Sequence, residues 1–362
     1  MKFAVFKEEI DRRVAVVPST IPKLKDLGLE ILVEAGAGQE ALYSDEEYSD
    51  QGAQVKSRSE LLKEAEIAIS IHPLPDAELK QLAKETLVIS QFQPFADEEI
   101  IGKLKGMGLR AFSLDMIPRT TLAQSMDVLS SMASIAGYKS ILEAASLLPR
   151  YFPMMITAAG SIKPSKVLIL GAGVAGLQAI ATARRLGAQV EAFDTRSAAK
   201  EEVLSLGAKF VEVEGAVEDK GAGGYGVQQS EDFLKRQRAE VQARAMKSDV
   251  IVTTAQVRGR KAPILVPKET VEKMKAGSVI VDLASSTGGN CELTEDLKVI
   301  QHKGVYILGN SSLASLMPQD ASFLYSNNLL NFAKVWMKEN QLALDMENEI
   351  IASALITAEK PE

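Results

Sequence analysis

The stretch that decides the fold is residues 166–194, K-V-L-I-L-G-A-G-V-A-G-L-Q-A-I-A-T-A-R-R-L-G-A-Q-V-E-A-F-D. An apolar run that predicts a buried strand passes into a G-x-G-x-x-G turn and then into a helical segment. Gly171 permits the tight turn, Gly173 lets backbone N–H groups approach a pyrophosphate, and Gly176 lets the helix pack closely on the strand. The helix N-terminus adds N–H donors and partial positive charge. The stretch therefore predicts a dinucleotide-binding βαβ unit.

The acidic residue that closes this stretch predicts which dinucleotide binds. Asp194 ends the second strand, at about the 20-residue spacing that a ribose-binding acid takes. Its carboxylate can accept hydrogen bonds from ribose hydroxyls and would repel a 2′-phosphate, which carries roughly −1.5 to −2 charges. The sequence therefore predicts NAD(H) rather than NADP(H). Arg196 is an argument for NADP(H) instead, because an arginine at this place can bind a 2′-phosphate.

Strand-like and helical runs alternate in both directions from this unit. The expected strands are rich in Val, Ile and Leu, which is typical of strands buried on both faces of a sheet. They are residues 4–6, 30–36, 66–71, 86–92 and 109–115, and then 166–173, 188–194, 208–215, 249–255, 278–284 and 304–310. This alternation predicts an α/β fold with two doubly wound parallel-sheet (Rossmann-like) domains.

A chain of 362 residues is too long for one ordinary core, which also favours two domains. Long helices expected at 126–148, which Pro149 ends, and at 320–338 would join them. The expected N-terminal domain is 1–128, completed by the C-terminal helices of 320–362. The expected NAD(H)-binding domain is 129–319.

Composition excludes several classes of protein. The formal net charge of −7 argues against a nucleic-acid binder, and 46% hydrophobic with 25% charged residues is typical of a soluble globular protein. The longest nearly apolar run, 167–182, contains Gln178 and three glycines, so no membrane span is predicted. The single cysteine, Cys291, excludes an intramolecular disulfide. No Cys, His and Asp cluster has the spacing of metal ligands, so no metal site is predicted.

A second polar segment, residues 117–131, lies at the start of an apolar helical run. Gln124, Asp127 and Ser130 are spaced by three and would fall on an arc of roughly 120° of one helix, just after Arg119. An amide, a carboxylate and a hydroxyl suit the carboxamide and ribose of a nicotinamide nucleotide. The other interpretation is a helix cap with a solvated face, for which the candidates are Thr120, Thr121 and Ser125. Position alone leaves both interpretations open.

Several segments together resemble the NAD(H)-binding component of proton-translocating NAD(P) transhydrogenase, the domain I or alpha-1 family. The likeness covers essentially the whole chain. It includes the R-x-x-x-x-Q-x-x-D pattern of Arg119, Gln124 and Asp127, which is highly specific for that family. The other segments are KEEIDRRVAVVPSTIPKL, GYKSILEAA, FPMMITAAGSIKPSKVLILGAGVAGLQAIATARRLGA, TTAQVRGRKAPILV, VDLASSTGGNCELT and NNLLNFAKV.

The resemblance implies roles for particular residues. Arg119, Gln124, Asp127 and Ser130 would reach the nicotinamide end of NAD(H). Further cofactor contacts would come from Val174, Asp194, Thr195, Arg196, Gly224, Gln237 and Gln256. The segment K-G-A-G-G-Y-G, residues 220–226, resembles the family's mobile loop, which closes over the nucleotide through its tyrosine, here Tyr225. Four glycines around one ring also predict a hinged lid from the residues alone, against the alternative of an ordinary surface loop.

The resemblance further implies a split active site. Hydride would pass directly between NAD(H) bound here and NADP(H) bound by a partner domain, with the NADP-binding and membrane-spanning subunits on separate chains. The protein would be a homodimer on the cytoplasmic face of the membrane, held there by its partners. Such a transfer needs two rings within about 3–3.5 Å and no side-chain acid or base.

Two other functions stay open. Alanine dehydrogenase shares the resemblance, and Arg13 matches its substrate arginine. Its lysine, histidine and aspartate positions hold Ile71, Gln93 and Ser286 here, with His72 one position from the lysine site. The lack of an acid or base at these positions favours transhydrogenase over dehydrogenase. The non-enzyme alternative is a NAD(H)-sensing module whose lid reports nucleotide occupancy.

Overall fold

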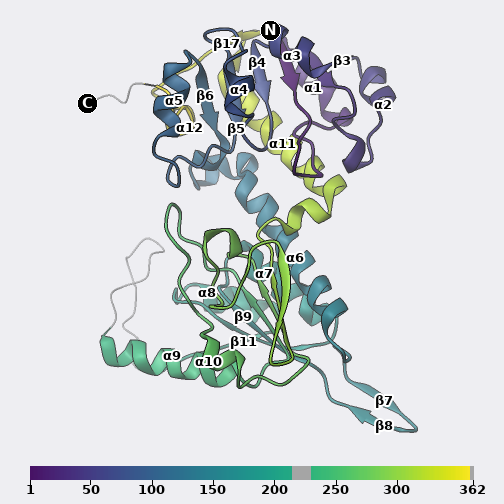
Figure 1. Cartoon of the computed structure of the whole chain (residues 1–362), viewed down its shortest axis with the longest axis vertical. Coiled ribbons are helices and arrows are strands. Elements are labelled where there is room, and N and C mark those ends of the chain that lie inside the picture. Colours follow the sequence, from purple (N-terminus) through teal and green to yellow (C-terminus); the bar gives the residue numbers. More distant parts are fainter. Residues whose placement is uncertain (214–229, 359–362) are drawn as a thin grey trace. The chain divides into compact units, whose positions relative to one another are not determined.

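The computed structural model describes residues 1–213 and 230–358 of the chain. They form two compact units, Met1–Met132 with Ala314–Glu362 (unit 1) and Ala133–Leu313 (unit 2). Each unit is a sheet covered by helices on both faces (Figure 1). The predicted α/β fold with two doubly wound parallel sheets is confirmed. Among the described residues, no helix is both long and apolar enough to cross a membrane.

The sheet of unit 1 has the strand order β3-β2-β1-β4-β5-β6, and all its strand pairs are parallel. The direction of winding reverses between β1 and β4, which is the usual place of a ligand crevice in such sheets. The strands are β1 (Lys2–Val5), β2 (Glu30–Glu34), β3 (Gln54–Lys56), β4 (Ile67–Ile69), β5 (Leu87–Ser90) and β6 (Arg110–Ser113). The short edge strand β3 is not predicted from the sequence, because none of its residues is fully buried.

Two apolar layers flank this sheet. One side carries α1 (Ile21–Lys25), α2 (Asp45–Asp50) and α11 (Pro318–Trp336). The other carries α3 (Arg58–Glu64), α4 (Asp76–Leu79) and α5 (Ile100–Gly106). The C-terminal segment also belongs here, because α12 (Glu349–Ala354) leads to Ile356, whose N–H donates to the Ala111 carbonyl at 3.0 Å.

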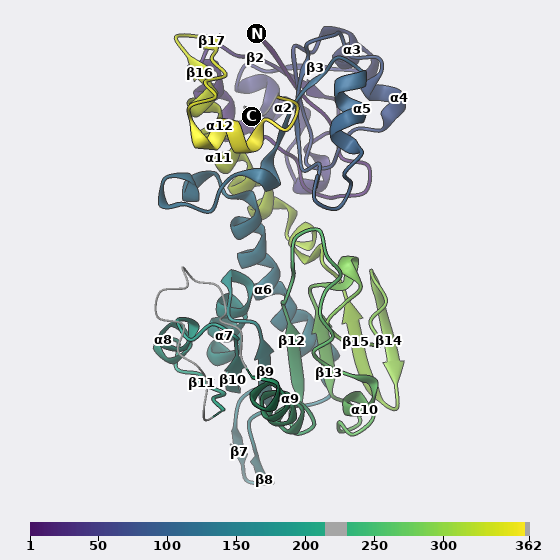
Figure 2. The same ribbon diagram turned by 90° about the vertical axis from the view of Figure 1, so that its left-hand side faces the viewer.

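The sheet of unit 2 has the order β11-β10-β9-β12-β13-β15-β14. Its strands are β9 (Lys166–Leu170), β10 (Gln189–Phe193), β11 (Lys209–Phe210), β12 (Val250–Thr253), β13 (Val279–Asp282), β14 (Lys298–His302) and β15 (Val305–Gly309). All neighbours are parallel except β14, which pairs antiparallel with β15 at the edge. The winding reverses between β9 and β12, directly beside the glycine turn. Figure 2 shows this sheet with its helices in front and behind.

Helices cover both faces of this second sheet as well. The apolar layer on one face includes α6 (Val128–Leu147), α7 (Val174–Arg185) and α8 (Ala199–Ser205). The opposite layer includes α9 (Glu231–Ala245) and α10 (Lys268–Val271). A hairpin of β7 (Met155–Thr157) and β8 (Gly160–Ile162), also not predicted, extends from the unit with every residue exposed (Figure 1).

Candidate functional site

The glycine turn joins β9 to α7, and the geometry explains two of its three glycines sterically. Gly171 has φ of 103°, and a Cβ there would lie 2.3 Å from Thr254 Oγ1. A Cβ at Gly176 would lie 1.9 Å from the Gly171 carbonyl oxygen, so only glycine lets α7 approach the strand. A Cβ at Gly173 would meet nothing within 4 Å. The turn is therefore tight at both ends and open in the middle, where a phosphate could approach the backbone.

The start of α7 is suited to an anion. Gly173 is the residue before its first turn, and no side chain caps the helix there. The first N–H groups of the helix thus have no side-chain acceptor, and the helix dipole adds partial positive charge at the same place. Val174, which the resemblance assigns to the cofactor, is exposed in this first turn.

Asp194 and Arg196 form one polar group beside the turn. Asp194 Oδ2 accepts a hydrogen bond from the Ala172 N–H at 2.8 Å, and Oδ1 accepts one from the Arg196 N–H at 2.8 Å. The Arg196 guanidinium donates to both carboxylate oxygens at 3.1 and 3.0 Å. Burial raises the pKa of Asp194, but the hydrogen bonds from Arg196 and Ala172 outweigh it and lower that pKa. The carboxylate is therefore ionised at neutral pH and already fixed against the turn.

The loops after β12 and β13 lie on the other side of the turn. Thr254 Oγ1 donates to the Gly171 carbonyl at 3.2 Å, and the exposed Gln256 donates to the Leu283 carbonyl at 2.7 Å. The Asn290 side chain accepts from the Ala255 N–H and donates to the Ala255 carbonyl, each at 2.9 Å. These contacts fix the spacing between the two loops and the glycine turn.

Asp282, at the end of β13, organises the second of these loops. It is fully buried and accepts four hydrogen bonds. The donors are Ala284 N at 3.0 Å, Asn290 N at 2.7 Å, Cys291 N at 2.9 Å and Thr294 Oγ1 at 2.7 Å. Neither Asp282 nor Asn290 is predicted from the sequence. The signal that could have identified them is an aspartate at the end of an otherwise apolar strand.

The remaining cofactor residues implied by the resemblance are more scattered. Thr195 is exposed next to Asp194, and Gln237 is half-buried in α9. Gly224 and Tyr225, together with the lid expected at residues 220–226, lie outside the described residues.

The polar segment of unit 1 differs from the expected helix. Gln124 lies in a 3-10 helix, Thr121–Met126, and α6 begins only at Val128. Asp127 lies between them in an extended conformation, with φ of −76° and ψ of 90°. The expected arc on one continuous helix beginning at residue 126 is therefore wrong, because the chain changes direction at Asp127.

The same aspartate nevertheless gathers most of the segment. Asp127 accepts hydrogen bonds from the Ser130 N–H at 2.9 Å and from Ser130 Oγ at 2.6 Å, so Asp127 itself caps α6. Arg119 Nε lies 3.9 Å from Asp127 Oδ2, and its side chain is 62% exposed. Gln124 is exposed on the preceding turn. The structure thus brings Arg119, Asp127 and Ser130 together and leaves the Gln124 amide free to turn.

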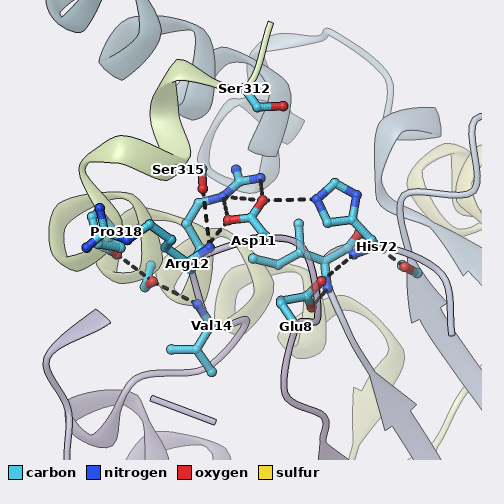
Figure 3. Close-up of polar contacts among 12 residues, drawn as sticks. Glu8, Asp11, Arg12, Val14, His72, Ser312, Ser315 and Pro318 are labelled. Atoms are coloured by element: carbon cyan, nitrogen blue, oxygen red, sulfur yellow. Dashed lines mark hydrogen bonds and ion pairs between the residues drawn. The ribbon is translucent and has the colours of Figure 1, made fainter. Parts of the chain in front are cut away.

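A second polar cluster in unit 1 surrounds Asp11, which is not predicted from the sequence. Arg13 donates to both Asp11 oxygens, with Nε at 2.9 Å from Oδ1. Figure 3 shows the His72 ring directed at Asp11, with Nε2 at 2.9 Å from Oδ2. Burial raises the pKa of Asp11, but the hydrogen bonds from His72 and Arg13 outweigh it and hold that pKa well below its usual range. Arg13 is therefore already paired with a carboxylate.

The positions that match the dehydrogenase's lysine, histidine and aspartate hold no acid or base, although the buried Glu8 lies beside the first of them. Ile71 is buried, and its N–H donates to Glu8 Oε1 at 2.6 Å. Burial raises the pKa of Glu8. Gln93 in unit 1 and Ser286 in unit 2 are both exposed. Within 1–213 and 230–358, no three His, Cys, Asp or Glu side chains are grouped to hold a metal ion.

Known protein families and solved structures match this chain over nearly its whole length. Models described as "Alanine dehydrogenase/PNT, N-terminal domain" and "Alanine dehydrogenase/PNT, C-terminal domain" match residues 4–136 and 140–360. The first of the parts that form NAD(P) transhydrogenase subunit alpha in Rhodospirillum rubrum is 38% identical over 99% of this chain and 96% of its own. A solved transhydrogenase structure from Sinorhizobium meliloti has a TM-score of 0.89 and 41% identity, covering 98% and 97%. A solved L-alanine dehydrogenase has a TM-score of 0.78 and 27% identity, covering 98% and 94%.

Proposed function

The chain belongs to the alanine dehydrogenase/PNT family, and from that premise we propose that it is the NAD(H)-binding component of a proton-translocating NAD(P) transhydrogenase. Hydride would pass directly between NAD(H) on this chain and NADP(H) on a partner domain. A separate membrane component would couple that transfer to proton translocation. The observation that carries the proposal is the nearly full-length likeness to transhydrogenases at 38% and 41% identity, against 27% for the alanine dehydrogenase.

Unit 2 offers the groups that a bound NAD(H) needs. The N–H groups at the start of α7 would hold the pyrophosphate over Gly173, where a side chain would otherwise stand. Asp194, kept ionised and oriented by its neighbours, would accept hydrogen bonds from the adenosine ribose. Val174, Thr195, Gln237 and Gln256 are proposed as further contacts. When bound, NAD(H) supplies or accepts the hydride.

The segment of Arg119, Gln124, Asp127 and Ser130 is proposed to orient the nicotinamide end. Asp127 and Ser130 are already fixed to each other by two hydrogen bonds, so they form a rigid base. Arg119 and Gln124, which precede this pair in the chain, are exposed and can adapt to a ligand. The role of this segment would be to position and shield a ring, because direct hydride transfer moves no proton to or from a side chain.

The partners are proposed on the same grounds. The relative from R. rubrum is named as one part of a subunit alpha, which supports NADP(H)-binding and membrane-spanning subunits on separate chains. The chain would then sit on the cytoplasmic face of the membrane through those subunits. A second copy of this chain would cover the β7–β8 hairpin, since an isolated two-stranded hairpin is marginal in water. Ile156 on that hairpin is 72% exposed and Met154 just before it is 60% exposed.

The dehydrogenase alternative is less well supported by the cluster around Asp11. A substrate carboxylate needs a cation to bind it, yet Arg13 is buried and paired with Asp11. His72 is held by the same carboxylate at 2.9 Å. Pyruvate would have to displace an internal ion pair, which costs binding energy.

The proposal is tested by measuring hydride transfer from NADPH to an oxidised NAD analogue. We expect transfer only when this chain is mixed with a separately purified NADP-binding domain of a transhydrogenase. Either component alone should give the background rate, because each holds one of the two rings. NADH oxidation by this chain alone with pyruvate and ammonia would instead support a dehydrogenase. NADH binding with no transfer in the mixture would support a sensing module.

Replacing Asp194 with alanine should raise the Kd for NADH by about tenfold or more, because charge-assisted hydrogen bonds to the ribose are lost. The change also releases Arg196 from its ion pair. The difference between the Kd for NADPH and the Kd for NADH should therefore become smaller. Fluorescence titrations with both nucleotides give the two constants. Glu202→Gln is the matched control, since it removes an exposed acid whose charge also acts on Arg196. If both substitutions changed the two Kd values equally, Asp194 would act only through its negative charge and not through hydrogen bonds to the ribose.

A further inference from the structure

Unit 2 has a hollow at the opposite end of its sheet from the glycine turn. It is about 500 Å³ in volume, within the range of small-molecule sites. The first residues of three strands line it, namely Lys166 of β9, Gln189 of β10 and Lys209 of β11. The last turns of α7 and α9 complete the wall through Arg184 and Arg244, and Lys247 adds to it just beyond α9. Figure 2 shows α9 beside these strands.

The charges around this hollow are unbalanced. Five cations line it, Lys166, Arg184, Lys209, Arg244 and Lys247, against the acids Glu191 and Glu240. Both acids are paired with the same cation, because Arg244 donates to Glu191 at 2.8 Å and to Glu240 at 2.7 Å. The other four cations form no ion pair with any described residue, and Arg184 only donates to the Ala188 carbonyl at 3.5 Å. The lining therefore carries about three surplus positive charges in a protein whose net charge is −7.

Helix ends account for part of this surplus but not for all of it. Helices α7, α8 and α9 finish at Arg185, Ser205 and Ala245, beside lining residues. Each C-terminus contributes roughly half a negative charge, so together they offset about half of the surplus. The remaining cations repel one another across the hollow, and a bound anion would relieve that repulsion.

We propose that this hollow binds a small phosphorylated molecule with at least two negative charges, at a site separate from the dinucleotide turn. Strand β9 spans five residues from Lys166 to Leu170, so the hollow and the turn are separated by about 17 Å along the strand. A di- or triphosphate suits four cations that form no ion pair within 1–213 and 230–358, because each can donate to a different oxygen. Gln189 and Ser248 add neutral polar groups to the same wall. This site does not depend on the transhydrogenase reaction.

The test is calorimetric titration of inorganic pyrophosphate into the full-length protein, with and without saturating NADH. We expect saturable binding that persists in NADH and weakens as salt is raised, since the contacts are electrostatic. Lys209→Glu and Lys247→Glu should each raise the pyrophosphate Kd by about tenfold or more. Lys235→Glu is the matched control, because it makes the same charge change at an exposed position of α9 that does not line the hollow. Circular dichroism confirms that each variant is folded.

Two results would overturn the proposal. Absence of saturable binding to the wild-type protein at low salt is one. The other is binding that NADH abolishes and that Lys209→Glu leaves unchanged, which places pyrophosphate at the glycine turn. The second result supports the dinucleotide site while removing this one, so failure here is distinct from failure of the proposed reaction.

Discussion

Replacing Asp282 with alanine is expected to lower the free energy of unfolding of unit 2 by about 3–5 kcal/mol. The carboxylate is fully buried at the end of β13 and accepts four hydrogen bonds, three of them from the backbone. Each unsatisfied buried donor costs about 1–3 kcal/mol, reduced where water can enter the space left by the side chain. Urea unfolding of the full chain, followed by a probe in unit 2, measures the loss.

The same substitution should also weaken NADH binding. Asp282 holds the Asn290 backbone, and the Asn290 amide holds Ala255 beside the glycine turn. Loosening the loop after β12 therefore changes the wall of the proposed nucleotide site. Glu201→Ala is the control, because Glu201 is exposed on α8, and it should change stability by less than about 0.5 kcal/mol. An Asp282→Ala protein within about 1 kcal/mol of wild type would show that the loop does not depend on the carboxylate.

The parallel core of each unit could be predicted because its strands are buried on both faces. Strands β9 and β12 are continuous apolar runs, and such runs are visible in a sequence without knowledge of their neighbours. The two antiparallel additions lack that signal. Strand β14 has no buried residue and turns into β15 through Lys303 and Gly304, both with positive φ. Lysine is not a residue that marks such a turn, so the hairpin is not apparent from the sequence.

The β7–β8 hairpin is not apparent for a related reason. Its strands pair as far as Thr157 and Gly160, so the turn consists of two alanines. Alanine carries no turn signal, and none of the hairpin residues is buried to give an apolar pattern. The limits expected for the two domains, 1–128 with 320–362 and 129–319, stay predictions.

Some residues of the candidate site can be predicted from a short stretch of sequence, whereas others come together only in the folded chain. The glycine turn and Asp194 depend on residues close in sequence, and their fingerprint includes the spacing. Asp127 also had a local signal, since an aspartate directly before an apolar run is a common N-cap. The cluster of Asp11 with His72 joins residues 61 positions apart, so only the folded sheet brings them together. Residue roles at the nucleotide stay proposals.

Replacing Gln124 with asparagine is expected to slow hydride transfer by about 100-fold while the Kd for NADH changes by less than about threefold. The substitution keeps the amide but withdraws it by one methylene, and a misplacement of about 1 Å can cost about 100-fold in rate. Single-turnover transfer with a saturating NADP-binding domain measures the rate, and fluorescence titration measures the affinity. Gln51→Asn is the matched control, because Gln51 is an exposed amide of the same unit at the end of α2.

The position of Gln124 in the fold lets this substitution separate a role in positioning from a role in local structure. Gln124 is exposed in the 3-10 helix, its side chain makes no hydrogen bond to a described residue, and its backbone carbonyl accepts from the Asp127 N–H at 3.3 Å. Shortening the side chain therefore leaves the Asp127–Ser130 cap intact, and any loss of rate comes from the amide itself. A weaker affinity for NADH with an unchanged transfer rate at saturating nucleotide would mean that Gln124 contributes to binding alike in the ground and transition states, and a positioning role would be excluded.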